Sequence, residues 1–164
     1  MADRIDETSG SPARSGVVSR QALDRVRGAR RDLHSAAEAL REAVNLAPGD
    51  DWYQVVRQRL VDLGVVLAAH IEDIEGAEGV YDDLLVQAPW QEAETEILEG
   101  EHQAIRDTLD VTLEALEAAR EENLEDPSPV RRRVGTLLER LDLHCQREME
   151  LVYEVYDTDI GPID

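Results

Sequence analysis

The stretch SPVRRRVGTLLERLDLHCQREMELVYEV, residues 128–155, decides the predicted fold. Its apolar residues recur at the three- and four-residue spacing of one helix face: Val130, Val134, Leu137, Leu141, Leu151 and Val155. Ser128 occupies the predicted N-cap and Pro129 the first turn, where both residue types are favoured. We therefore predict a long amphipathic helix that begins here and ends near Gly161 and Pro162.

The same pattern occurs three more times before this stretch. The first helix is predicted to begin at Ser19 and to end at the APGD turn, residues 47–50. The second runs from Asp51 toward Pro89, and the third from Pro89 to Asn123. Two glycines in the second helix, at positions 76 and 79, predict a kink or a π-bulge in its second half.

Four long helices joined by short turns predict an all-α protein, an antiparallel up-down-up-down four-helix bundle over residues 19–164. Residues 1–18 are rich in Ser, Gly, Pro and charge, and we expect a flexible N-terminal tail. The composition agrees with this fold class, because Phe is absent and Leu, Ala, Glu and Arg dominate the helical segments.

The formal net charge of -20 argues against nucleic acid as a partner, because such a surface repels phosphate backbones. No stretch approaches the roughly 18 apolar residues that a membrane span needs. The polar start of the chain lacks the apolar segment of a signal peptide, and the single cysteine predicts no disulfide framework. We expect a cytoplasmic protein, a monomer or a dimer.

Each predicted helix carries one of the four histidines, namely His34, His70, His102 and His144. All four lie near the middle of their helices, and mid-helix positions of antiparallel neighbours share one level of a bundle. Three of them fall on the apolar stripes, whereas His34 flanks its stripe beside Leu33. We therefore predict one layer of four imidazoles across the core.

Carboxylates accompany this layer. Glu148 follows His144 by four residues, so both project from one helix face at an otherwise apolar level. Glu75 follows His70 by five residues, about 140° around an ideal helix, and the glycines beside it allow a local distortion. Two further carboxylates are secondary candidates, Glu38 and Glu101. Imidazole and carboxylate in a bundle core suit iron, manganese or zinc, so we predict a metal site.

A simpler interpretation remains open. A single mid-helix histidine is more often an ordinary core residue than a ligand, and an isolated HxxxE pattern on a helix is common. A plain structural bundle would bind no stoichiometric metal.

Three stretches resemble the hemerythrin-like, or HHE cation-binding, domain: LAAHIEDIEGAEGVYDDL, LEGEHQAIRDTL and LDLHCQREMELVYE. The order of histidines and carboxylates on the four helices is similar to that family from about residue 20 to residue 160. The third stretch, which continues to VYDTDIG, looks most like an actinobacterial branch of these proteins.

The resemblance implies two iron ions bridged by two carboxylates and an oxo or hydroxo species. It assigns His34, His70, His102 and His144 as terminal ligands and Glu75 and Glu148 as bridges. Arg106 stands where the family has a second third-helix histidine, and the two carboxylate spacings are reversed. Glu38, Glu101 or a tyrosine then substitutes for that histidine, or the metal keeps an open position.

The resemblance predicts a protein that binds or reacts with a small oxidant or diatomic molecule: O2, NO or H2O2. An open metal position favours reaction over storage, and the activity it would allow is consumption of peroxide or nitric oxide; whether the protein turns over its ligand or only binds it is left undecided by the sequence. The alternative is a metal- or redox-responsive sensor or interaction bundle without turnover.

Overall fold

The computed structural model describes the backbone of residues 13–49 and 51–157 and the side chains of residues 20–49 and 51–155. Its elements are α1 (Ala13–Asn45), α2 (Trp52–Glu75), α3 (Val80–Gln87), the 3-10 helix η1 (Pro89–Gln91), α4 (Glu92–Glu121) and α5 (Ser128–Asp157). This described part is entirely helical apart from its turns, and it contains no strand.

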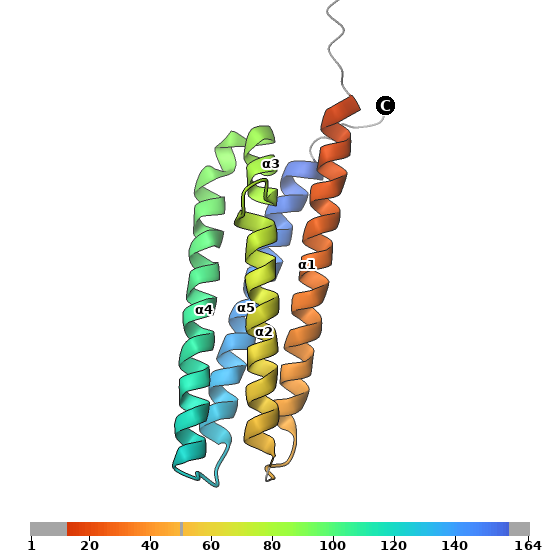
Figure 1. Ribbon diagram of the computed structural model, residues 1–164. Coiled ribbons are helices and arrows are strands. Elements are labelled where there is room, and N and C mark those ends of the chain that lie inside the picture. The colour runs from red at the N-terminus through yellow and green to blue at the C-terminus, as the bar shows by residue number, and fades with distance from the viewer. Residues whose placement is uncertain (1–12, 50, 158–164) are drawn as a thin grey trace, which may run out of the picture.

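The four long helices lie side by side and alternate in direction (Figure 1). α1 packs against α2 and α5, and α4 packs against the same two helices, which closes the bundle. The predicted all-α, up-down-up-down four-helix arrangement is therefore confirmed. Within the described ranges no helix is long and apolar enough to cross a membrane.

Two helix boundaries differ from the sequence expectation. α1 begins at Ala13, before the predicted N-cap Ser19. The second predicted helix is broken, not kinked: α2 ends at Glu75, and a separate helix, α3, begins at Val80. The predicted end of the last helix near Gly161, and residues 1–12 of the predicted tail, lie outside the described residues.

Gly76 and Gly79 explain this break. A Cβ atom on Gly76 would lie 2.3 Å from the carbonyl oxygen of Glu72, and one on Gly79 would lie 2.5 Å from that of Ile74. Between the two glycines, Glu78 adopts a positive φ of 64°. The chain thus approaches itself too closely for side chains at either glycine. α3 becomes a separate helix that packs against α1, α2 and α5.

The apolar core is divided into two clusters along the bundle axis. The first cluster includes Leu67, Ile105 and Leu141, and the second includes Ile74, Leu98 and Val152. His70, His102 and His144 lie between these residues on α2, α4 and α5. A polar layer therefore separates two apolar halves of the core.

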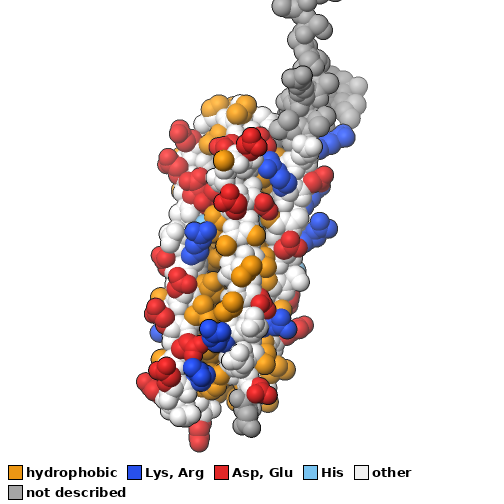
Figure 2. Space-filling model, in the orientation of Figure 1, with side chains coloured by type: hydrophobic (Ala, Val, Ile, Leu, Met, Phe, Trp, Pro, Cys, Tyr) orange, Lys and Arg blue, Asp and Glu red, His pale blue; other side chains and the backbone are white. Residues whose placement is uncertain are grey.

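The surface of the bundle is acidic, in keeping with the net charge of -20. Figure 2 shows Asp and Glu side chains spread over the visible face, with Arg side chains between them and hydrophobic side chains gathered along the middle.

Candidate metal centre

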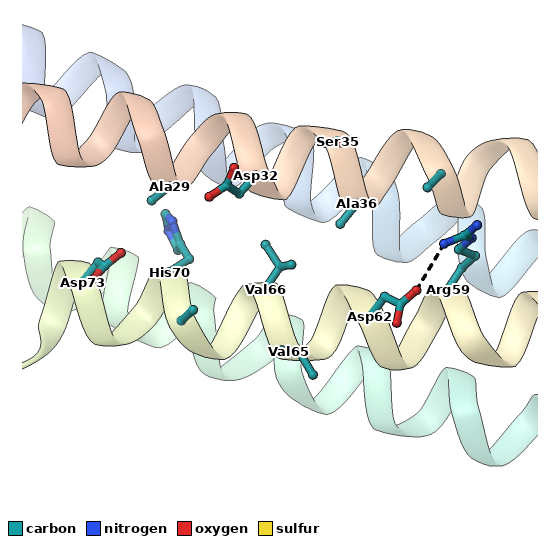
Figure 3. A pocket seen from close by; sticks show the side chains of 12 residues that line it. Ala29, Asp32, Ser35, Ala36, Arg59, Asp62, Val65, Val66, His70 and Asp73 are labelled. Atoms are coloured by element: carbon teal, nitrogen blue, oxygen red, sulfur yellow. Dashed lines mark hydrogen bonds and ion pairs between the residues drawn. The ribbon is translucent and has the colours of Figure 1, made fainter.

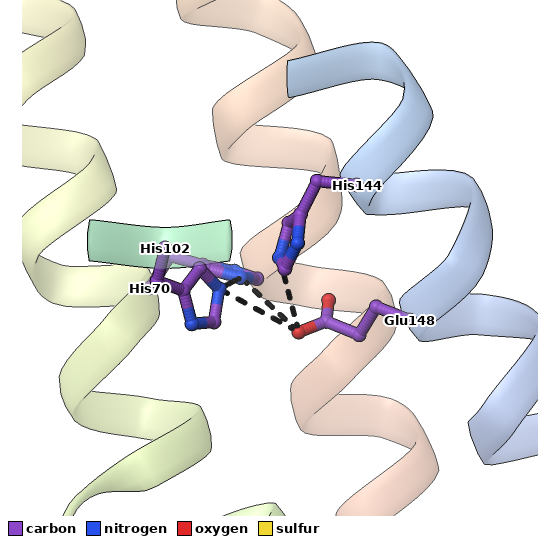
Figure 4. Close-up of side chains that lie close together, drawn as sticks. All are labelled: His70, His102, His144 and Glu148. Atoms are coloured by element: carbon purple, nitrogen blue, oxygen red, sulfur yellow. Dashed lines mark hydrogen bonds and ion pairs between the residues drawn. The ribbon is translucent and has the colours of Figure 1, made fainter. Parts of the chain in front are cut away.

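Four buried polar side chains meet in the layer between the two apolar clusters. His70 comes from α2, His102 from α4, and His144 and Glu148 from α5 (Figure 4). One candidate ligand atom from each residue lies within 4.8 Å of the other three. None of the four residues is more than 1% exposed. The structure thus shows a buried cluster of three histidines and one glutamate that could hold a metal ion.

The separations between these atoms are close to those of a single coordination sphere. The Nε2 atoms of His70 and His102 are 3.2 Å apart. Oε1 of Glu148 lies 3.3 Å from Nε2 of His70, 3.9 Å from that of His102 and 3.8 Å from that of His144. Ligands about 2.1 Å from one ion in tetrahedral or octahedral geometry are themselves about 3.0 to 3.4 Å apart. Small adjustments would bring all four atoms to one ion.

The outer nitrogens of two imidazoles are held by carboxylates. Nδ1 of His144 lies 3.1 Å from Oε2 of Glu101, and Nδ1 of His102 bonds Oε1 of Glu75. A carboxylate accepts, so each Nδ1 carries the proton and each Nε2 is left with a lone pair that faces the cluster. Two lone pairs and the carboxylate of Glu148 therefore face one another, an arrangement that a cation stabilises.

Several atoms of the cluster lack a hydrogen-bond partner among the described residues. These atoms are Nδ1 of His70, Nε2 of His144 and Oε2 of Glu148. A buried polar atom without a partner costs on the order of 1–3 kcal/mol. Metal coordination would satisfy Nε2 of His144, which is an independent indication of a ligand at this position.

Two of the imidazoles, those of His102 and His144, are in the protonation state that binds metals. Burial, together with the neighbouring imidazoles of His144 and His70, lowers the pKa of His102 to about 2. Burial also lowers the pKa of His144, although Glu148 and Glu101 act in the opposite direction. Both side chains are therefore neutral at pH 7, as a metal-binding histidine must be.

Tyr81 is a neighbour of the cluster that the sequence analysis did not identify. It lies in the first turn of α3, is 3% exposed, and donates a hydrogen bond of 3.4 Å to Oε1 of Glu148. Burial, followed by the charge of Glu148, raises the pKa of its phenol. Gly76 and Gly79 were the sequence feature that could have indicated Tyr81. They break the helix before it, and the break allows α3 to direct a side chain toward the core.

The other residues predicted as ligands lie outside this cluster. His34 is exposed, whereas Leu33 and Ala37 are the α1 residues beside it that are buried in the core. Glu38 is half-buried and pairs with Arg41. Arg106, at the position of the missing histidine, is exposed. Among the described residues, α1 thus contributes no atom to the cluster.

Glu75 and Glu101 occupy an intermediate place, beside the cluster but outside it. Their side chains are 25% and 24% exposed and face the outer nitrogens of His102 and His144. Burial, followed by the charge of Glu99, raises the pKa of Glu75. Glu101 also pairs with Arg147 of α5. Each glutamate therefore orients one histidine of the cluster from a position beside it.

No family model, curated protein or solved structure matches the chain. Membership of the hemerythrin-like family therefore stays a prediction that rests on the sequence stretches quoted above.

Proposed function

We propose that this protein is a non-haem iron protein that binds or reacts with a small oxidant or diatomic molecule. The observation that carries the proposal is the convergence of two imidazole lone pairs and a carboxylate on one buried point. A purely structural core would gain nothing from acceptors that face one another, whereas a bound cation stabilises them. Imidazole with carboxylate suits iron well.

The chemistry follows from the ligand set. A non-haem iron with imidazole and carboxylate ligands supplies a site where O2, NO or H2O2 can bind and exchange electrons. His70, His102, His144 and Glu148 would hold it, and the two apolar clusters on either side would exclude bulk water and larger substrates. The phenol of Tyr81 would hold Glu148 in position.

The number of iron ions bound per chain can be measured directly. The four converging atoms support one ion, whereas the hemerythrin-like resemblance calls for two. A second iron would have to draw on Glu75 and Glu101, which stand next to the cluster but hydrogen-bond His102 and His144.

Elemental analysis after iron-replete expression is the test. About one iron per chain would support a mononuclear centre, and about two would support the carboxylate-bridged pair. Less than a few tenths of an ion per chain would exclude the proposal. Iron protein whose absorption and paramagnetic resonance spectra stay unchanged on adding O2, NO and H2O2 would exclude the reactive role.

A further inference from the structure

A metal ion must cross the bundle surface to reach the cluster, because none of its four residues is more than 1% exposed. Two surface cavities reach a residue of the cluster. One lies between α1 and α2, has a volume of about 460 Å³ and is lined in part by His70. The other lies between α4 and α5, has a volume of about 200 Å³ and is lined in part by His144.

The cavity between α1 and α2 has an acidic rim. Asp32 of α1 and Asp73 of α2 both line it, and neither has an ion pair or hydrogen bond within the described part of the chain. A third carboxylate, Asp62, lies farther along and pairs with Arg59 at 3.3 Å. Figure 3 shows Asp32 and Asp73 flanking His70 from the two helices. Two unneutralised carboxylates therefore stand at the mouth of this cavity.

His70 connects this cavity with the cluster. Its Nε2 faces Glu148 and His102, while its Nδ1 has no partner among the described residues. The side chain is fully buried and points from α2 toward Ala29 of α1 (Figure 3). The acidic rim thus leads to a buried, unpartnered nitrogen of the same imidazole that faces the cluster.

The cavity between α4 and α5 has the opposite character. Ile105, Leu143 and Ala104 line it, together with Arg140. The guanidinium of Arg140 bonds the hydroxyl of Thr108 and no carboxylate. Glu101 is the one acidic residue of its lining, and that side chain already pairs with Arg147. Among the described residues, the lining of this cavity offers a cation no unpaired carboxylate, whereas the cavity between α1 and α2 offers two.

We propose that the cavity between α1 and α2 is the entrance through which a divalent cation is loaded, with Asp32 and Asp73 capturing the ion before His70 passes it inward. This inference rests on the proposed metal centre. The two aspartates raise the local cation concentration and so accelerate loading. They are not needed once the ion has reached His102, His144 and Glu148.

The test is stopped-flow loading of metal-free protein with Co²⁺, followed by the absorption of the bound ion. The double variant Asp32→Asn, Asp73→Asn should load about tenfold more slowly than wild type at low salt. The difference should shrink as salt screens the rim charges, and the final cobalt content should equal that of wild type. The matched control is Asp110→Asn, Glu114→Gln, which removes two exposed charges from α4.

The outcomes separate this inference from the proposed function. Wild type that binds no cobalt and no iron would overturn the metal centre itself. Wild type that loads while the rim variant loads equally fast would overturn the entrance alone. A control variant that is slowed as much as the rim variant would also overturn it, because overall surface charge would then explain the rate. Circular dichroism of both variants checks that the bundle is folded.

Discussion

Glu101 of α4 reaches across to α5 and holds Nδ1 of His144 at 3.1 Å. Glu75 does the same for His102 from the last turn of α2. Each pair fixes the tautomer of its imidazole and directs the lone pair of Nε2 inward. These two glutamates support the cluster from outside, a role different from the bridging role that the resemblance assigns to Glu75.

Substitutions should distinguish residues that bind the metal from nearby residues that do not. His144→Ala and Glu148→Ala should each remove most metal binding, because each removes an atom that faces the common point. His34→Ala should leave binding unchanged, since His34 is exposed. Metal content after dialysis measures the effect. Normal metal content in Glu148→Ala, or a large loss in His34→Ala, would contradict this ligand set.

Glu75 and Glu101 should affect the affinity for metal more than the number of ions bound at saturation. Glu75→Gln and Glu101→Gln remove the charged acceptor behind an imidazole, which in metal sites costs about 10- to 100-fold in affinity. At saturating metal both variants should still bind as many ions as wild type if one ion occupies the cluster. Competition titration with a chelator of known affinity measures this. Glu38→Gln, on α1, is the control and should bind like wild type.

If Glu75→Gln or Glu101→Gln instead halves the saturating metal content, these residues are ligands of a second ion. The same titration therefore distinguishes one ion from the carboxylate-bridged pair.

The metal-free protein should lose stability as the pH falls below 6.5. The pKa of His102 is lowered to about 2, so the unfolded chain binds a proton that the folded chain does not. This stability is present above pH 6.5 and is lost progressively toward pH 2. At pH 5 the loss attributable to His102 should be about 2 kcal/mol. His144, whose pKa is also lowered, adds to it.

Urea unfolding at pH 7 and pH 5, for wild type and His102→Gln, measures this contribution. Protonation of surface carboxylates changes both proteins alike, so the difference between them isolates the histidine. An equal loss of stability in the two proteins would contradict the lowered pKa.

A side chain at Gly79 should destabilise the turn before α3. A Cβ there would lie 2.5 Å from the carbonyl oxygen of Ile74, so Gly79→Ala should destabilise the fold by about 1–3 kcal/mol. Gly28→Ala is the matched control, because its added Cβ would meet no atom of the described residues within 4 Å beyond its chain neighbours and the adjacent backbone of its own helix. In the helical α1 it should be neutral or stabilise by up to about 1 kcal/mol. Thermal unfolding of both variants compares them, and equal melting temperatures would contradict the tight turn.

The sequence by itself determined the bundle and most of the cluster. Helical spacing of apolar residues is a local property, and it also identifies side chains that share a stripe, such as His144 and Glu148. His70 and His102 were found in the same way, since each replaces an apolar residue on its stripe. Their level in the core followed from antiparallel packing, which requires only helix lengths and short turns.

Only the tertiary structure decided what surrounds the cluster. His34 lies on an exposed face of α1, and Ala29 is the α1 residue that lies opposite His70 (Figure 3). The partners of Nδ1 on His102 and His144 come from neighbouring helices or another turn, so no spacing reveals them. Tyr81 depends on how α3 packs after a break made by two glycines. These contacts are set by rotation and packing between helices, which a single helical pattern does not specify.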